Sequence, residues 1–251
     1  MSVSNNQMLS SCFRMRVLKG FLVVLFALAV ASCLPDQEIR LYSASFFFAD
    51  SASGWEGDFA DYPVDSSGYH LQVGLDTLPY NLNADSTKKA IRISGINRSD
   101  DLFMFIKRKV SGLRKNTTYE ILFNVRLASN APVGAVGIGG GPGESVYVKV
   151  GATTHEPKKE LDDADIYRLN INKGNQSEGG ENMIVIGHVG VAATTPQKYA
   201  LIVRNNNSSN SVYATTDDRG DLWLIVGTES GFEGETTLYY TQIDVLFNQV
   251  D

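Results

Sequence analysis

Cysteine is nearly absent from this chain: two of its 251 residues are cysteines, and both lie within the first 33. The remaining residues therefore have no thiol for a disulfide or a zinc site, and their stability has to come from a packed core. Runs of Lys and Arg are absent too. The 22 basic residues face 28 acidic ones, a formal charge of −6, which disfavours nucleic acid and anionic phospholipid head groups as partners.

The one long apolar run, residues 20–30, is N-terminal and too short to span a bilayer as a mature helix. Three cations precede it, and the small residues Ala31 and Ser32 separate it from Cys33. This pattern is typical of a bacterial lipoprotein signal. We therefore expect residues 1–32 to be a signal peptide, Cys33 to carry lipid and 33–38 to be a lipidated tether. The alternative is an ordinary signal peptide beside an unrelated cysteine, with Met1, Met8 or Met15 as the start.

The predicted tether suggests where the protein resides. Leu34 does not favour inner-membrane retention, as an Asp in its place would, and Asp36 and Glu38 resemble the acidic signal that some bacteria use for surface display. We expect a lipid-anchored protein of the cell envelope, in the outer membrane or at the cell surface. Residues 1–32 hold three Lys or Arg and no acid, so their removal changes the formal charge from −6 to −9.

From residue 39 onward, short segments rich in β-branched and aromatic residues alternate with Gly, Asn, Asp, Ser and Pro clusters. No amphipathic segment of helical period exceeds two turns, and no repeat or linker divides the chain. Residues 39–251 are therefore predicted to form a single all-β domain, a β-sandwich. The predicted strands are 39–48, 89–94, 102–110, 118–127, 145–150, 183–189, 199–203, 222–226 and 237–247.

Residues 109–129 carry a turn followed by an alternating strand. Gly112 permits the turn, Asn116 and Thr117 close it, and Tyr119 begins a strand whose odd positions are expected to face the core. This segment resembles the "val-x-gly-leu-x-x-asn-thr-x-tyr" hairpin of jelly-roll carbohydrate-binding modules, and residues 217–224 and 238–247 resemble their last two strands. The resemblance implies a jelly roll of the galactose-binding or carbohydrate-binding-module type, and hence a binding protein.

The chain departs from that pattern at Thr241, where such modules often carry an Asp that ligates calcium. A structural calcium ion is therefore doubtful, and no other cofactor is expected. His70, His155 and His188 lack ligand spacing, so no metal site is predicted.

Ligand contacts are expected from aromatic residues, because sugars present apolar C–H faces that stack on Trp and Tyr. Trp55 lies in a polar, glycine-rich stretch, so it is either a stacking platform with Tyr62 or a plug closing the sandwich. Polar neighbours would bind the sugar hydroxyls. These are Asn97, Arg98 and Asp100.

The sequence thus favours a non-catalytic glycan-binding lipoprotein, with two alternatives. One is a polysaccharide hydrolase or lyase that uses Glu144, Glu229 and Glu233, which lie beside glycine turns. The other is a structural lipoprotein that docks another envelope protein through an apolar patch.

Overall fold

The computed structural model describes residues 41–84 and 87–250. The predicted signal peptide, Cys33 and the tether lie outside these residues. Among the described residues, no helix is long and apolar enough to cross a membrane.

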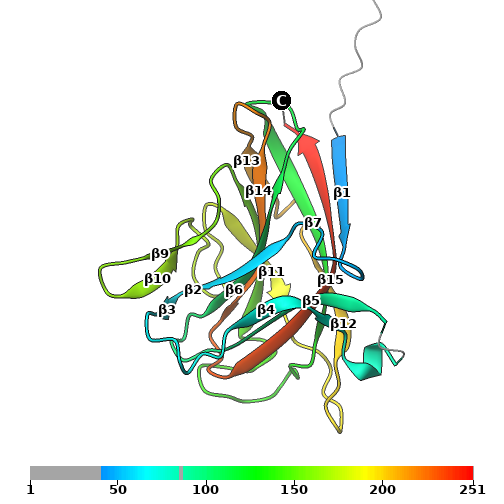
Figure 1. Cartoon of the computed structure of the whole chain (residues 1–251), viewed down its shortest axis with the longest axis vertical. Helices are drawn as coiled ribbons and strands as arrows, with labels where there is room; N and C mark the ends of the chain where they lie inside the picture. Colours follow the sequence, from blue (N-terminus) through cyan, green and yellow to red (C-terminus); the bar gives the residue numbers. More distant parts are fainter. Residues whose placement is uncertain (1–40, 85–86, 251) are drawn as a thin grey trace, which may run out of the picture. The chain divides into compact units, whose positions relative to one another are not determined.

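The chain folds into two large antiparallel sheets and one small one (Figure 1). Sheet A has the order β12-β7-β15-β5-β4, with β1 beside β15 and β13 beside β7, and sheet B has the order β11-β8-β14-β6-β2. The strands of sheet A are β1 (Leu41–Phe47), β4 (Gln72–Thr77), β5 (Lys89–Ile96), β7 (Thr118–Ser129), β12 (Ala200–Asn205), β13 (Val212–Thr215) and β15 (Glu235–Gln249). Those of sheet B are β2 (Glu56–Ala60), β6 (Phe103–Val110), β8 (Val146–Thr153), β11 (Met183–His188) and β14 (Leu222–Ser230). The small sheet joins β3 (Tyr62–Pro63), β10 (Ile166–Leu169) and β9 (Lys159–Leu161), and one 3-10 turn, η1, spans Tyr80–Leu82.

Successive strands pass from one large sheet to the other. The chain crosses between the sheets at each step from β5 (A) through β6 (B) and β7 (A) to β8 (B), and again from β11 (B) to β12 (A), from β13 (A) to β14 (B) and from β14 to β15 (A). This crossing pattern is that of a jelly-roll β-sandwich, the predicted fold class.

The core lies between the two sheets, and β7 shows how the sequence specifies it. Its residues at odd positions from 119 to 127 are all buried, as the alternation predicts. The turn before β7 also matches its prediction, because Gly112 and Asn116 both have positive φ, 90° and 48°.

The outer face of sheet B is covered by residues 154–182, which include β9 and β10. Leu169 and Ile171 from this segment pack on a second apolar cluster outside the main core. That cluster consists of Ala60, Phe103, Phe105, Met183 and Ile225. The segment therefore brings its own polar residues against the outer face of sheet B.

Candidate functional site

Trp55 lies in the core. Its side chain is 4% exposed and packs edge-to-face on Phe46 and Phe48, with ring centroids 5.6 and 6.3 Å away. Ser53 and Gly54 before it both have positive φ, and the backbone N–H of Trp55 donates to the Ala52 carbonyl (2.8 Å), which turns the chain back toward the core. The expectation of an exposed stacking platform at Trp55 is therefore wrong.

Tyr62 and Asn97 are buried as well. Tyr62 packs between Tyr69 and Tyr167, with ring centroids 5.9 and 5.2 Å away. The Asn97 amide donates to two main-chain oxygens at the end of β14, at 2.7 and 3.0 Å. Both side chains hold the structure together and present no free group to a ligand.

Arg98 and Asp100 remain exposed in the turn between β5 and β6. The Arg98 Nε donates to the Gly68 carbonyl (2.9 Å), and the Asp100 carbonyl accepts from the Gln176 amide (3.1 Å). The turn is thus tied to the segment that covers sheet B.

The three glutamates of the hydrolase alternative have separate environments. The Glu144 carboxylate accepts from the Gly134 backbone N–H (2.6 Å), and Glu233 is exposed in the turn between β14 and β15. Glu229 is fully buried, and each of its oxygens contacts a lysine ammonium, from Lys149 or Lys173. Both carboxylate oxygens of Glu229 are thus engaged in ion pairs.

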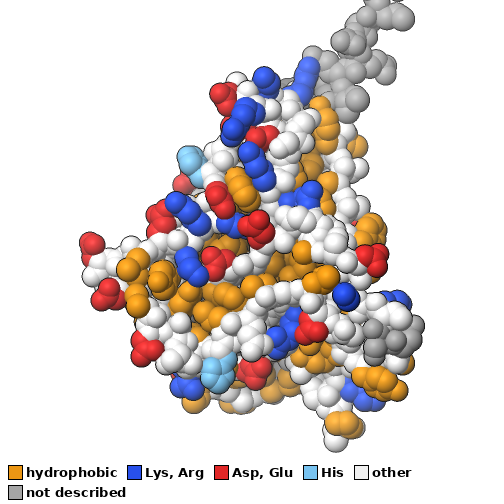
Figure 2. All heavy atoms as spheres, in the orientation of Figure 1, with side chains coloured by type: hydrophobic (Ala, Val, Ile, Leu, Met, Phe, Trp, Pro, Cys, Tyr) orange, Lys and Arg blue, Asp and Glu red, His pale blue; other side chains and the backbone are white. Residues whose placement is uncertain are grey.

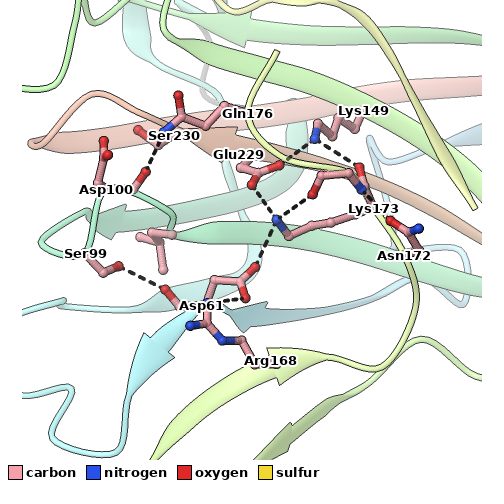
Figure 3. Close-up of polar contacts among 12 residues, drawn as sticks. Asp61, Ser99, Asp100, Lys149, Arg168, Asn172, Lys173, Gln176, Glu229 and Ser230 are labelled. Carbon is pink, nitrogen blue, oxygen red and sulfur yellow. Dashed lines mark hydrogen bonds and ion pairs between the residues drawn. The ribbon is translucent and has the colours of Figure 1, made fainter. Parts of the chain in front are cut away.

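Glu229 belongs to a chain of alternating charges on the outer face of sheet B (Figure 3). We call it the charge chain; its members, in order, are Lys149, Glu229, Lys173, Asp61 and Arg168. Lys149 Nζ lies 2.5 Å from Glu229, and Lys173 Nζ bridges Glu229 and Asp61, the latter at 3.1 Å. Arg168 Nη1 contacts the other oxygen of Asp61 at 3.2 Å.

The sheet register brings this chain together. Lys149 of β8 is paired with Gly227 of β14, and Glu229 lies two residues further along β14, so both side chains are on the outward face. Lys149 also donates to the carbonyls of Lys173 and Glu178, at 3.0 and 2.9 Å, so all three ammonium hydrogens have acceptors. Burial lowers the pKa of Lys149, and its ion pair with Glu229 opposes that shift. The segment that supplies Lys173 is thus fixed to sheet B by a buried ion pair.

A hollow of about 350 Å³ opens beside the charge chain. Asp61, Arg168 and Lys173 line it together with Asp101, Asn172 and Asn175, and Leu169 and Ile171 add apolar surface. The Arg168 side chain is 45% exposed. The hollow therefore combines fixed donors and acceptors with an apolar part.

Asp101 contributes a carboxylate to this hollow. Its carboxylate makes no hydrogen bond or ion pair with another described residue. Burial raises the pKa of Asp101; Lys173 opposes this rise, and Glu229, Asp61 and Asp100 add to it. Within the described part of the chain, no group of three or more His, Cys, Asp or Glu side chains could hold a metal ion.

Comparisons with known proteins leave the family open. No family model and no curated protein matches the chain. Among solved structures, a mannan-recognising carbohydrate-binding module, TmCBM27, is 12% identical with a TM-score of 0.35, covering 84% of this chain and 99% of that one. A putative sugar-binding protein from Bacteroides thetaiotaomicron is 11% identical (TM-score 0.36; 78% and 88% covered). The adhesin domain of Lys-gingipain from Porphyromonas gingivalis is 7% identical (TM-score 0.34; 81% and 97% covered).

A carbohydrate-binding module and a putative sugar-binding protein are thus among the matches. At such identities and TM-scores they do not decide what this chain binds.

Sequence reasoning missed Asp61, Asp101, Lys149, Arg168 and Lys173. One signal was available: Lys149 interrupts the otherwise apolar strand β8, and a buried lysine needs a paired acid. Nothing local indicates that its partner is Glu229, 80 residues away.

Proposed function

We propose that this domain binds a neutral oligosaccharide or polysaccharide, without catalysis, in the hollow beside the charge chain. The observation that carries the proposal is the free Asp101 carboxylate, which faces the same hollow as the exposed guanidinium of Arg168. A hydroxyl group both donates and accepts hydrogen bonds, so neighbouring sugar hydroxyls match this acceptor and donor.

The balance of charge favours a neutral ligand. Among the residues that line the hollow, the two cations Arg168 and Lys173 are matched in number by the two acids Asp61 and Asp101. On the face drawn in Figure 2, Lys and Arg side chains are likewise interspersed with Asp and Glu. A charged ligand would be repelled by the residues of like charge in the hollow. The hydroxyl groups of a neutral ligand would find both hydrogen-bond donors and acceptors there.

The ion pairs of the charge chain also hold the hydrogen-bond donors in place before a ligand binds. Asp61 holds Arg168 and Lys173 from two sides, and Lys149 fixes the segment that carries Lys173. Side chains that are already ordered lose little entropy when a ligand arrives.

Paired variants test the proposal. The protein is screened on an array of neutral glycans, with calcium and with chelator, and the affinity for the best ligand is measured for Asp101→Asn and Asp100→Asn. Loss of a charged acceptor costs about 1.5–3 kcal/mol, so Asp101→Asn should weaken binding roughly tenfold or more. Asp100→Asn, the same change one residue away, should leave the affinity unchanged.

Other results would point elsewhere. Equal affinities for both variants would remove the hollow as the binding site. Shortened glycans in the incubation would revive the hydrolase alternative, and an array without binding would favour an envelope protein as the partner. The proposed lipid on Cys33 would hold the protein at the membrane in each case.

A further inference from the structure

A second hollow, of about 410 Å³, lies between β1 of sheet A and β6 of sheet B. Tyr42, Phe46 and Phe247 contribute aromatic surface, and Ser43 and Ser111 contribute hydroxyl groups. Arg108 reaches this hollow from β6. Unlike the hollow beside the charge chain, it has an unpaired cation.

The position of Arg108 on β6 accounts for its isolation. Met104 and Ile106 of this strand point into the main core, and Arg108 continues the same alternation. The next residue, Lys109, faces the other way and pairs with Asp221 at 2.7 Å.

Arg108 has no counter-ion among residues 41–84 and 87–250. Its guanidinium lies over the Phe46 ring, 4.5 Å from the centroid, and its Nε is buried without a hydrogen-bond partner. It makes no hydrogen bond or ion pair with any other described residue. Burial lowers the pKa of Arg108, and no acid in the described part of the chain opposes that shift. A partly buried, unpaired charge raises the free energy of the folded state, and an anion that binds there would offset the cost.

The backbone leaves room for this guanidinium. A Cβ atom at Gly54 would come within 2.5 Å of Arg108 Nη1, and Gly54 has a φ of 74° that favours glycine. The turn that sends Trp55 into the core therefore also makes space for Arg108.

We propose that this second hollow binds an acidic sugar, with its carboxylate or sulfate held by Arg108. A guanidinium can donate two parallel hydrogen bonds to such a group. The sugar ring would lie on the partly exposed ring of Tyr42, and the exposed Ser43 and Ser111 can meet hydroxyl groups. The choice of a sugar rests on the proposed function, whereas the choice of an anion rests on Arg108.

Titration calorimetry with acidic oligosaccharides tests this site. The probes are tetragalacturonate, which carries carboxylates, and a sulfated galactan tetrasaccharide; a neutral galactan tetrasaccharide serves as the reference. We expect at least one acidic probe to bind, with an affinity that falls as salt is added. Whichever acidic probe binds identifies the anion.

Variants assign the binding to Arg108. Arg108→Gln should lower the affinity for the acidic probe at least about tenfold, since a charge-assisted pair is lost. Arg126→Gln, which removes an exposed arginine outside the hollow, should bind as the wild type does. Arg108→Lys keeps the charge but loses the planar fork, so it should bind more weakly than the wild type and serves if the glutamine variant does not fold.

The proposal is overturned if neither acidic probe binds the wild type, or if both Arg108 variants bind like Arg126→Gln. Asp101→Asn separates it from the proposed function, because this variant should lose the neutral glycan and keep the acidic probe. Failure of the neutral-glycan screen would therefore leave the result at Arg108 intact.

Discussion

Trp55 shows how composition around a residue can mislead. Its neighbours Ser53, Gly54, Glu56 and Gly57 suggested a surface position, yet the positive φ values at Ser53 and Gly54 direct the indole into the core. Polar neighbours indicate that the backbone runs along the surface, but the side chain between them can still point into the core.

Trp55→Ala should therefore destabilise the fold. Removing a buried indole that contacts Phe46 and Phe48 leaves a cavity, and such changes cost about 3–5 kcal/mol. Urea unfolding measures the loss. Tyr80→Ala, at a side chain that is 76% exposed, is the control and should change the stability by less than about 0.5 kcal/mol. A Trp55 variant as stable as this control would mean that the ring is not packed as described.

At the scale of elements, the buried ion pair of Lys149 and Glu229 fastens residues 173–178 to sheet B. Glu229→Gln leaves two ammonium groups beside a neutral amide, and breaking a buried pair from one side costs about 3–5 kcal/mol. Replacing both partners, as in Lys149→Met with Glu229→Leu, should cost less than the two single changes together.

A double-mutant cycle measured by urea unfolding checks this coupling. Hydrogen exchange should also show faster opening of residues 173–178 in Glu229→Gln, with the exchange of β7 unchanged. Additive single changes would indicate that the pair contributes no coupling energy.

The turn between β13 and β14 gives an acid-sensitive element. The Asp217 carboxylate accepts from the backbone N–H groups of Arg219 and Asp221, at 2.9 and 2.8 Å. These bonds, with the one to Asp221 the largest contribution, lower the pKa of Asp217 to about 2 from 3.8. Because the pKa of Asp217 is lower in the folded than in the unfolded protein, its charged carboxylate stabilises the fold above pH 3.8. This stabilisation is lost as the pH falls from 3.8 toward 2.

Asp217→Asn should therefore be less stable than the wild type at neutral pH, and the difference should shrink between pH 3.8 and about 2. Urea unfolding of both proteins across this range provides the measurement. A difference that stays constant down to pH 2 would contradict the role of the carboxylate charge.

The strands that could be predicted are those that carry the core. β7 and β14 have apolar residues at every second position or in long runs, and both were expected. β4 was missed because it is a short, exposed edge strand in which only two apolar residues, Val73 and Leu75, alternate with polar ones. β15 carries a shift in register between Tyr240 and Gln242, so its buried positions change from even to odd numbers.

At the scale of the whole molecule, alternation along the chain is a local signal, whereas the hollows are made by segments far apart in sequence. Asp61, Asp101 and Lys173 meet only because residues 154–182 fold over sheet B. In the sequence nothing distinguishes Arg108 from other arginines in strands, because its surroundings are formed by β1 and Gly54, which lie far from it in the chain. The sequence could therefore indicate a jelly roll, but not where its polar groups converge.

We predict that lipid on Cys33, and not the charge of the protein, attaches the molecule to a membrane. Without residues 1–32 the chain has a formal charge of −9, so an anionic membrane surface repels it and only the lipid on Cys33 would hold it there. In a bacterial host, Cys33→Ser should move the protein from the membrane fraction to the soluble fraction at low and at high salt. Cys12→Ser, at the other cysteine, should leave the distribution unchanged. Retention of Cys33→Ser at the membrane after a high-salt wash would mean that a protein partner or an uncleaved leader holds it instead.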